Sequence, residues 1–405
     1  MNTTDLMPLP ARPSLAQYRK QAKELLKSYK AGESAAVERV KQFHPRAKEL
    51  SSEEFVLADA QWALARQHGF ESWPKFVKCV EALLKASSPA SRFEQAVEAV
   101  VGGDLGALRR LLGEDPSLVN ARSPRVHGAM LLHYVGANGV ENYRQKTPRN
   151  AVEIARALLD AGAEVDAECG AYGKDTALGL VATSIHPLAA GVQLPLMELL
   201  IERGASLEGA PGGWTIVPAA LANGRKAAAV YLAERGASLD LEGAAGVGRL
   251  DVVSGCFDAE GRLKPGVPES KLLRGFHWAC EYGRGRVIEF LLDRRPELVR
   301  DASTGMTGLH WAIVGGELEA MKTLIARGAP LEVENQYGGT ALGQALWFAM
   351  TATNGIDYPA TVEVLLAAGS EIEQGSLGWV TRQASASLAT RERVSAALRQ
   401  YGAES

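Results

Sequence analysis

Three histidines occupy matching places in this chain and are the first candidates for chemistry. His133, His277 and His310 each follow a large apolar residue and precede an aromatic one, as in Leu309-His310-Trp311. Imidazoles are common metal ligands and general bases. A metal site, however, needs ligands that converge in one coordination sphere. If the histidines belong to successive packed helix pairs, about 8–10 Å separates neighbours. A shared metal site is therefore not predicted.

The usual signatures of catalysis and of cofactor binding are missing from the sequence. It holds no G-x-S-x-G, H-E-x-x-H or G-x-x-x-x-G-K-[ST] motif, and Gly170–Lys174 (GAYGK) only resembles part of the last. The four cysteines, Cys79, Cys169, Cys256 and Cys280, lack the C-x-x-C spacing of a zinc site or redox motif. We predict no catalytic, cofactor-binding or metal-binding residues, and we predict that the protein is not an enzyme.

A repeated unit must position these residues. Residues 307–339 read TGLHWAIVGGELEAMKTLIARGAPLEVENQYGG, and the next copy begins at Thr340-Ala341-Leu342. Related starts occur at Met130, Thr176, Thr215 and Arg274, and related Gly-Ala stops at Gly162, Gly204 and Gly236. The unit resembles the ankyrin repeat in its T-P-L-H-x-A start and its period of 33 residues. The resemblance implies that the repeated histidine ties down the turn before the first helix by hydrogen bonding.

The predicted fold class is all-α. We expect an ankyrin-repeat solenoid of about nine helix pairs, with short hairpin or loop fingers, over residues 91–405. A small helical N-terminal domain over residues 13–86 precedes it, and residues 1–12 form a disordered leader. Ser14 and Ser72 are expected to cap two of its helices. Its stretch from Leu57 to Phe76 resembles a module at the N-terminus of bacterial ankyrin-repeat proteins.

Composition is ordinary for a folded protein, with 46% hydrophobic and 22% charged residues and a net charge of −3. Neither a signal peptide nor an apolar run of about 18 residues is evident, so we expect a cytoplasmic protein with no membrane span. Between Arg12 and Lys48 ten Lys or Arg residues face three Glu residues, a net of +7. This asymmetry suggests a solvated helix face, a surface that meets an acidic neighbour, or a nucleic-acid contact.

Three repeats carry insertions between their helices. The insertions are Val140–Asn150 in repeat two, His186–Val192 in repeat three and Met350–Asp357 in repeat eight. Insertions in repeat proteins usually gather on one functional face. The first contains Tyr143, Arg144 and Lys146, which we interpret as an exposed aromatic-basic run that binds a partner.

Four further residues are candidate partner contacts because the ankyrin resemblance puts their positions on the concave face. They are Glu281, Tyr282, Trp347 and Phe348. Exposed aromatic residues are enriched at binding hot spots. Packing under the enlarged turn of repeat eight explains Trp347 and Phe348 equally well. Trp278 and Trp311 share another repeat position and are interpreted as core.

The resemblance implies a non-enzymatic scaffold that binds a partner protein on its concave surface and enlarged loops. Two alternatives stay open. One is a nucleic-acid-associated factor that uses the basic N-terminal module. The other is a small-molecule binder or enzyme at the enlarged loops of repeats two and three. The partner's identity and the oligomeric state do not follow from the sequence.

Overall fold

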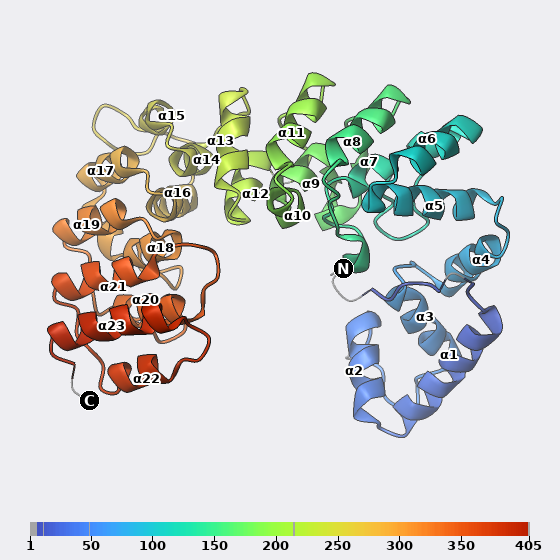
Figure 1. Cartoon of the computed structure of the whole chain (residues 1–405), viewed down its shortest axis with the longest axis horizontal. Coiled ribbons are helices and arrows are strands. Elements are labelled where there is room, and N and C mark those ends of the chain that lie inside the picture. Colours follow the sequence, from blue (N-terminus) through green and yellow to red (C-terminus); the bar gives the residue numbers. More distant parts are fainter. Residues whose placement is uncertain (1–5, 11, 48, 214, 404–405) are drawn as a thin grey trace. The chain divides into compact units, whose positions relative to one another are not determined.

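A computed structural model describes residues 6–10, 12–47, 49–213 and 215–403. The chain is almost wholly helical and divides into two compact units, Met1–Gly236 and Ala237–Ser405. Figure 1 colours the elements in chain order. The predicted all-α fold is confirmed. The predicted domain ranges, which include the undescribed residues 48, 214, 404 and 405, stay a prediction.

Four helices open the first unit: α1 (Leu15–Lys30), α2 (Ser34–Phe43), α3 (Leu57–Gln67) and α4 (Trp73–Leu83). The Ser14 and Ser72 side chains accept hydrogen bonds from the amides of Gln17 and Lys75, as capping predicts. The third helix starts at Leu57 and does not extend back to Ser51. The reason is local, because Ser51 and Glu54 bond to each other and close a separate turn.

The leader differs from the predicted disorder where it is described. Residues 1–5 and 11 lie outside the described residues. Leu6 is buried, and the Met7 amide donates to the Gln67 carbonyl oxygen at 2.9 Å. Apolar burial and a backbone hydrogen bond together hold this segment against the end of α3.

The remaining elements of the first unit form the first repeats. The helices are α5 (Pro89–Gly102), α6 (Leu105–Glu114), α7 (Leu131–Tyr134), α8 (Ala151–Asp160), α9 (Ala177–Thr183), α10 (Ile185–Ala189), α11 (Gln193–Glu202), α12 (Ile216–Ala222) and α13 (Lys226–Glu234). Short 3-10 turns are η2 (Pro116–Asn120), η3 (Asn142–Arg144) and η4 (Ala171–Gly173). Strands β1 (Glu168–Cys169) and β2 (Asp175–Thr176) pair antiparallel in one finger, with Glu168 opposite Thr176.

The second unit stacks five helix pairs. They are α14 (Leu241–Val247) with α15 (Leu250–Gly255), α16 (Glu269–Glu281) with α17 (Gly285–Arg294), α18 (Gly308–Gly315) with α19 (Leu318–Ala326), α20 (Ala341–Thr351) with α21 (Tyr358–Ala367), and α22 (Ser376–Arg382) with α23 (Leu388–Gln400). The turn η5 (Pro296–Arg300) follows α17. From α14 to α20, the first helix of each pair packs on the first helix of the next. One buried apolar cluster runs from Leu241 to Leu398, so each pair completes its core against its neighbours.

Two of the three matching histidines fasten the turn before a helix, as the resemblance implies. His133 Nδ1 accepts from the Met130 amide at 3.1 Å, and Nε2 lies 2.8 Å from the Ala167 carbonyl oxygen. His310 Nδ1 lies 2.8 Å from the hydroxyl of Thr307, which caps α18. His277 differs because α16 starts at Glu269, so no helix begins three residues before it.

Candidate functional site

The inserted turn of repeat two carries three of the predicted partner contacts, and the structure corrects the description of them as an exposed run. Arg144 is buried and Tyr143 is partly buried, while Lys146 is exposed. Arg144 ends the short turn η3, which directs its side chain inward toward α5. The prediction that Arg144 is exposed is therefore wrong. Arg144 is buried because its guanidinium group pairs with nearby carboxylates.

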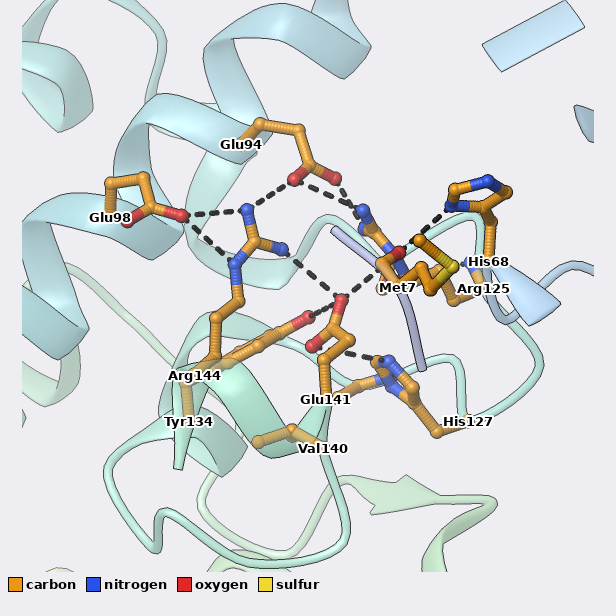
Figure 2. Close-up of polar contacts among 12 residues, drawn as sticks. Met7, His68, Glu94, Glu98, Arg125, His127, Tyr134, Val140, Glu141 and Arg144 are labelled. Atoms are coloured by element: carbon orange, nitrogen blue, oxygen red, sulfur yellow. Dashed lines mark hydrogen bonds and ion pairs between the residues drawn. The ribbon is translucent and has the colours of Figure 1, made fainter. Parts of the chain in front are cut away.

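Arg144 is the centre of an ion-pair network, which Figure 2 shows in close-up. Its guanidinium lies 2.5 Å from a carboxylate oxygen of Glu94 and 2.8 Å from one of Glu98. It also lies 3.1 Å from Glu141 Oε1 in the same turn. Arg125 makes a parallel set of contacts, with Glu94 at 2.5 Å and Glu141 at 2.9 Å. Two guanidinium groups and two buried carboxylates thus alternate, with Glu98 at the exposed rim.

The network holds these carboxylates ionised despite their burial. Burial alone raises the pKa of Glu141, but Arg125, His127 and Arg144 outweigh it and hold that pKa well below its usual value. The pKa of Glu94 is lowered by the same balance, with burial opposed by the two guanidinium groups. Burial, and then the Glu141 carboxylate, raise the pKa of the Tyr134 hydroxyl. Charges buried this deeply need such partners.

This ion-pair network is better suited to stabilising the fold than to catalysis. A general base or nucleophile needs a free, activated group within reach of a substrate. Glu94 and Glu141 each contact both guanidinium groups, and the histidine nearest Glu141, His127, is buried. The network ties the inserted turn and the loop around Arg125 to α5. We assign it a structural role.

A pocket of about 780 Å³ lies beside the network. Its lining includes Pro8 and Leu9 of the leader, faces of α5 and α6, and Tyr143 with Arg144. Residues 186–192 of the repeat-three insertion are not among its lining residues. Three arginines line it, and each is paired: Arg125 and Arg144 with carboxylates of the network, and Arg110 with Glu114. The pocket therefore offers no free cation from the network to a ligand.

The candidate contacts at repeat six lie at the end of α16. Tyr282 is buried, with 6% of its surface exposed, so our prediction of an exposed aromatic there is wrong. Next to it, α16 and α18 approach each other closely, since a Cβ on Gly315 of α18 would lie 1.8 Å from the Glu281 carbonyl oxygen. Glu281 itself is largely buried, and this burial raises the pKa of its carboxyl to about 7.

The candidate contacts at repeat eight differ from each other. Trp347 on α20 is 54% exposed. Phe348, next to it, is half-buried and stacks on Tyr358 of α21, with ring centroids 4.9 Å apart. The rings of Trp347 and Phe348 meet edge to face at 5.2 Å. Phe348 thus packs under the enlarged turn, as the packing interpretation predicted. Trp347 stays accessible, as the partner-contact interpretation predicted.

The tryptophans predicted as core behave as expected at one position and partly at the other. Trp278 is buried, with 8% of its surface exposed. Trp311 is half-buried against the core and stacks on His277 at 6.0 Å. Burial lowers the pKa of His277 to about 4, so this imidazole is neutral.

Sequence reasoning missed the partners of Arg144. Glu94 and Glu98 are four residues apart on α5, so they share one face of that helix. Arg125 and Glu141 both lie in or beside loops, where charged residues are normally solvated. The only sign of the network in the sequence was the four-residue spacing of Glu94 and Glu98 on α5. It does not say which cations that helix face meets.

The comparison with protein-family models agrees with the repeat. Residues 276–375 match the family model described as ankyrin repeats (3 copies). No curated protein matches the chain. Among solved structures, the human ASB11 ankyrin repeat domain aligns with 19% identity over 69% of this chain and 99% of that chain, with a TM-score of 0.36. No helix in the described ranges is long and apolar enough to cross a membrane. The chain therefore contains ankyrin repeats over residues 276–375, with a helical region before them.

Proposed function

We propose that this protein is a non-enzymatic scaffold that binds a partner protein on the concave face of its repeats. Ankyrin repeats generally mediate protein–protein interaction, through side chains that stacked repeats present on a shared surface. The observation that carries the proposal is the exposure of Trp347 on α20, within the matched repeats. Tryptophan is among the residue types most enriched at binding hot spots.

The surroundings of Trp347 suit a binding hot spot. Phe348 contacts its ring at one edge and is itself held by Tyr358, so the indole rests on a fixed neighbour. A pre-ordered aromatic residue loses little freedom on binding. Glu281 occupies the corresponding place two repeats earlier, and Lys146 is the exposed member of the first insertion. We keep both as secondary contacts in the proposal.

A matched pair of variants tests the proposal. Trp347→Ala removes the exposed indole, and Tyr401→Ala removes an aromatic ring that is 44% exposed just after α23. The full chain and both variants are immobilised and exposed to a native cell extract, and the retained proteins are quantified by mass spectrometry. We expect a protein that the parent and Tyr401→Ala retain equally, and that Trp347→Ala loses by at least about tenfold. If all three chains retain the same proteins in the same amounts, the assignment of Trp347 is wrong.

A further inference from the structure

A second pocket lies in the first unit, between α4 and the loop that follows η2. Its volume is about 830 Å³. We call it the Arg66 pocket and define it by its lining residues: Arg66, Glu71, Lys75, Lys78, Cys79, Ala82, Ala90, Ser123, Pro124, Arg125 and Val126. It contains none of the residues proposed above as partner contacts.

The wall opposite α4 is held in place before any ligand arrives. The Val126 amide donates to the Gly69 carbonyl oxygen at 2.8 Å, which pins the loop to the end of the α3 segment. The Arg125 side chain beside it is buried and paired with Glu94 and Glu141. A wall fixed in this way lowers the entropy that a ligand must overcome on binding.

The pocket has an excess of positive charge that the protein itself does not neutralise. Arg66, Lys75 and Lys78 face one carboxylate, that of Glu71. Glu71 pairs with Lys75, and both side chains are mostly exposed, so this contact is weak. Across the described part of the chain, no carboxylate lies within 4.0 Å of the Arg66 guanidinium or of Lys78 Nζ.

Arg66 is oriented and partly desolvated. Its guanidinium lies over the Trp62 ring, 5.2 Å from the centroid. Burial lowers its pKa, and the charge of Glu71 offsets this only in part. A planar guanidinium favours paired hydrogen bonds to a carboxylate or phosphate. An anion in the pocket would supply the partner that the protein lacks.

Part of the pocket lining is apolar. Ala82 and Ala90 present methyl groups, Val126 is 44% exposed, and burial raises the pKa of the Cys79 thiol to about 11, which keeps it neutral. None of the lining residues is aromatic. Proteins that bind single-stranded nucleic acid normally stack bases on aromatic rings. The lining therefore favours carboxylates and aliphatic side chains over bases.

We propose that the Arg66 pocket binds an acidic peptide segment of a partner protein. Arg66 and Lys78 bind two of its carboxylates, and an aliphatic side chain of the same segment packs on Ala82, Ala90 and Val126. The complementarity is that of acidic-motif recognition by clustered cations. This site lies apart from Trp347 in sequence and does not depend on the function proposed for that residue.

Fluorescence anisotropy tests the proposal with defined probes. One probe is a short labelled peptide of alternating Glu and Leu, and the matched probe has Gln in place of Glu. The full chain is compared with Arg66→Gln/Lys78→Gln and with the control Arg109→Gln/Lys85→Gln. Lys85 and Arg109 are exposed and do not line the pocket, so the control removes the same charge from nearby surface.

We expect the Glu peptide to bind the parent and the control equally, and the pocket variant at least about tenfold more weakly, at about 0.15 M salt. The Trp347→Ala chain should bind the Glu peptide like the parent. Three results would overturn the proposal. They are equal binding of the Glu and Gln peptides, equal weakening by both double variants, or binding of a labelled single-stranded oligonucleotide in preference to the Glu peptide. Circular dichroism of each variant confirms that the fold is intact.

Discussion

Two residue pairs that each contain an aromatic side chain look alike in the sequence but differ in their exposure in the structure. Tyr143-Arg144 and Trp347-Phe348 both lie in or beside enlarged inter-helix turns, and both were predicted to contact a partner. Arg144 turns inward to Glu94 and Glu141, whereas Trp347 stays 54% exposed. The difference shows that an insertion can stabilise a repeat array as well as present residues for binding. The role of an insertion depends on the side chains that the neighbouring helix places against it.

Two carboxyl groups extend the comparison to electrostatics. Glu141 and Glu281 are both largely buried, and burial raises the pKa of each. At Glu141 the nearby guanidinium groups more than offset this and lower the pKa. At Glu281 only a hydrogen bond involving Tyr282 opposes burial, and the pKa rises to about 7. Glu141 is therefore a stabilising member of a network, whereas ionisation of Glu281 lowers the stability of the folded chain.

The largest expected effect comes from breaking the network. Arg144→Ala should lower the free energy of unfolding by about 3–5 kcal/mol, because it leaves the buried Glu141 carboxylate short of a partner. Lys146→Ala, an exposed cation in the same insertion, should change it by less than about 0.5 kcal/mol. Urea unfolding of both variants measures this. Equal effects would show that the network does not hold the turn.

Glu281 gives a pH-dependent counterpart. The folded chain keeps its proton up to about pH 7, whereas the unfolded chain loses it near the usual value of 4.5. Between these values the folded state binds more protons, so the contribution of Glu281 to stability falls as pH rises. Glu281→Gln should therefore raise the free energy of unfolding by about 1–3 kcal/mol at pH 8 and leave it nearly unchanged at pH 4. Urea unfolding at the two pH values tests this prediction. The same increase in the free energy of unfolding at both values would refute the assignment of the effect to the ionisation of Glu281.

The turn histidine should have a smaller, purely structural effect. His310→Ala should destabilise the chain by about 1–3 kcal/mol, because the buried Thr307 amide and hydroxyl lose their partner. Binding measured at a temperature where the variant is folded should equal that of the parent. Unchanged stability combined with lost binding would contradict this role.

The smallest expected effect on stability is at the exposed ring. Trp347→Ala should change the free energy of unfolding by less than about 1 kcal/mol, while Phe348→Ala should cost more because it removes the stack on Tyr358. Thermal unfolding of the two variants compares them directly. A larger loss at Trp347 than at Phe348 would mean that the indole is part of the core.

Local signals explain what the sequence could predict. The cap at Thr307, its bond to His310 and the Gly-Ala stops act within a few residues, so the repeat and its all-α fold were accessible from the pattern. The fate of Arg144 depends on Glu98 and Glu94, which lie 46 and 50 residues away. Whether a charged side chain is exposed is set by such distant contacts, and one sequence does not reveal them. The burial of Tyr282 at the end of α16 was likewise not visible in the sequence.

Side-chain footprinting with hydroxyl radicals tests the central claim most directly. The full chain is labelled alone and in complex with a protein that it retains from extract, and modified residues are quantified by mass spectrometry. The account predicts that Trp347 is labelled in the free chain and protected in the complex, while Tyr143 changes little. Protection of Tyr143 with continued labelling of Trp347 would contradict it, because the inserted turn would then bind the partner and the exposed ring would not.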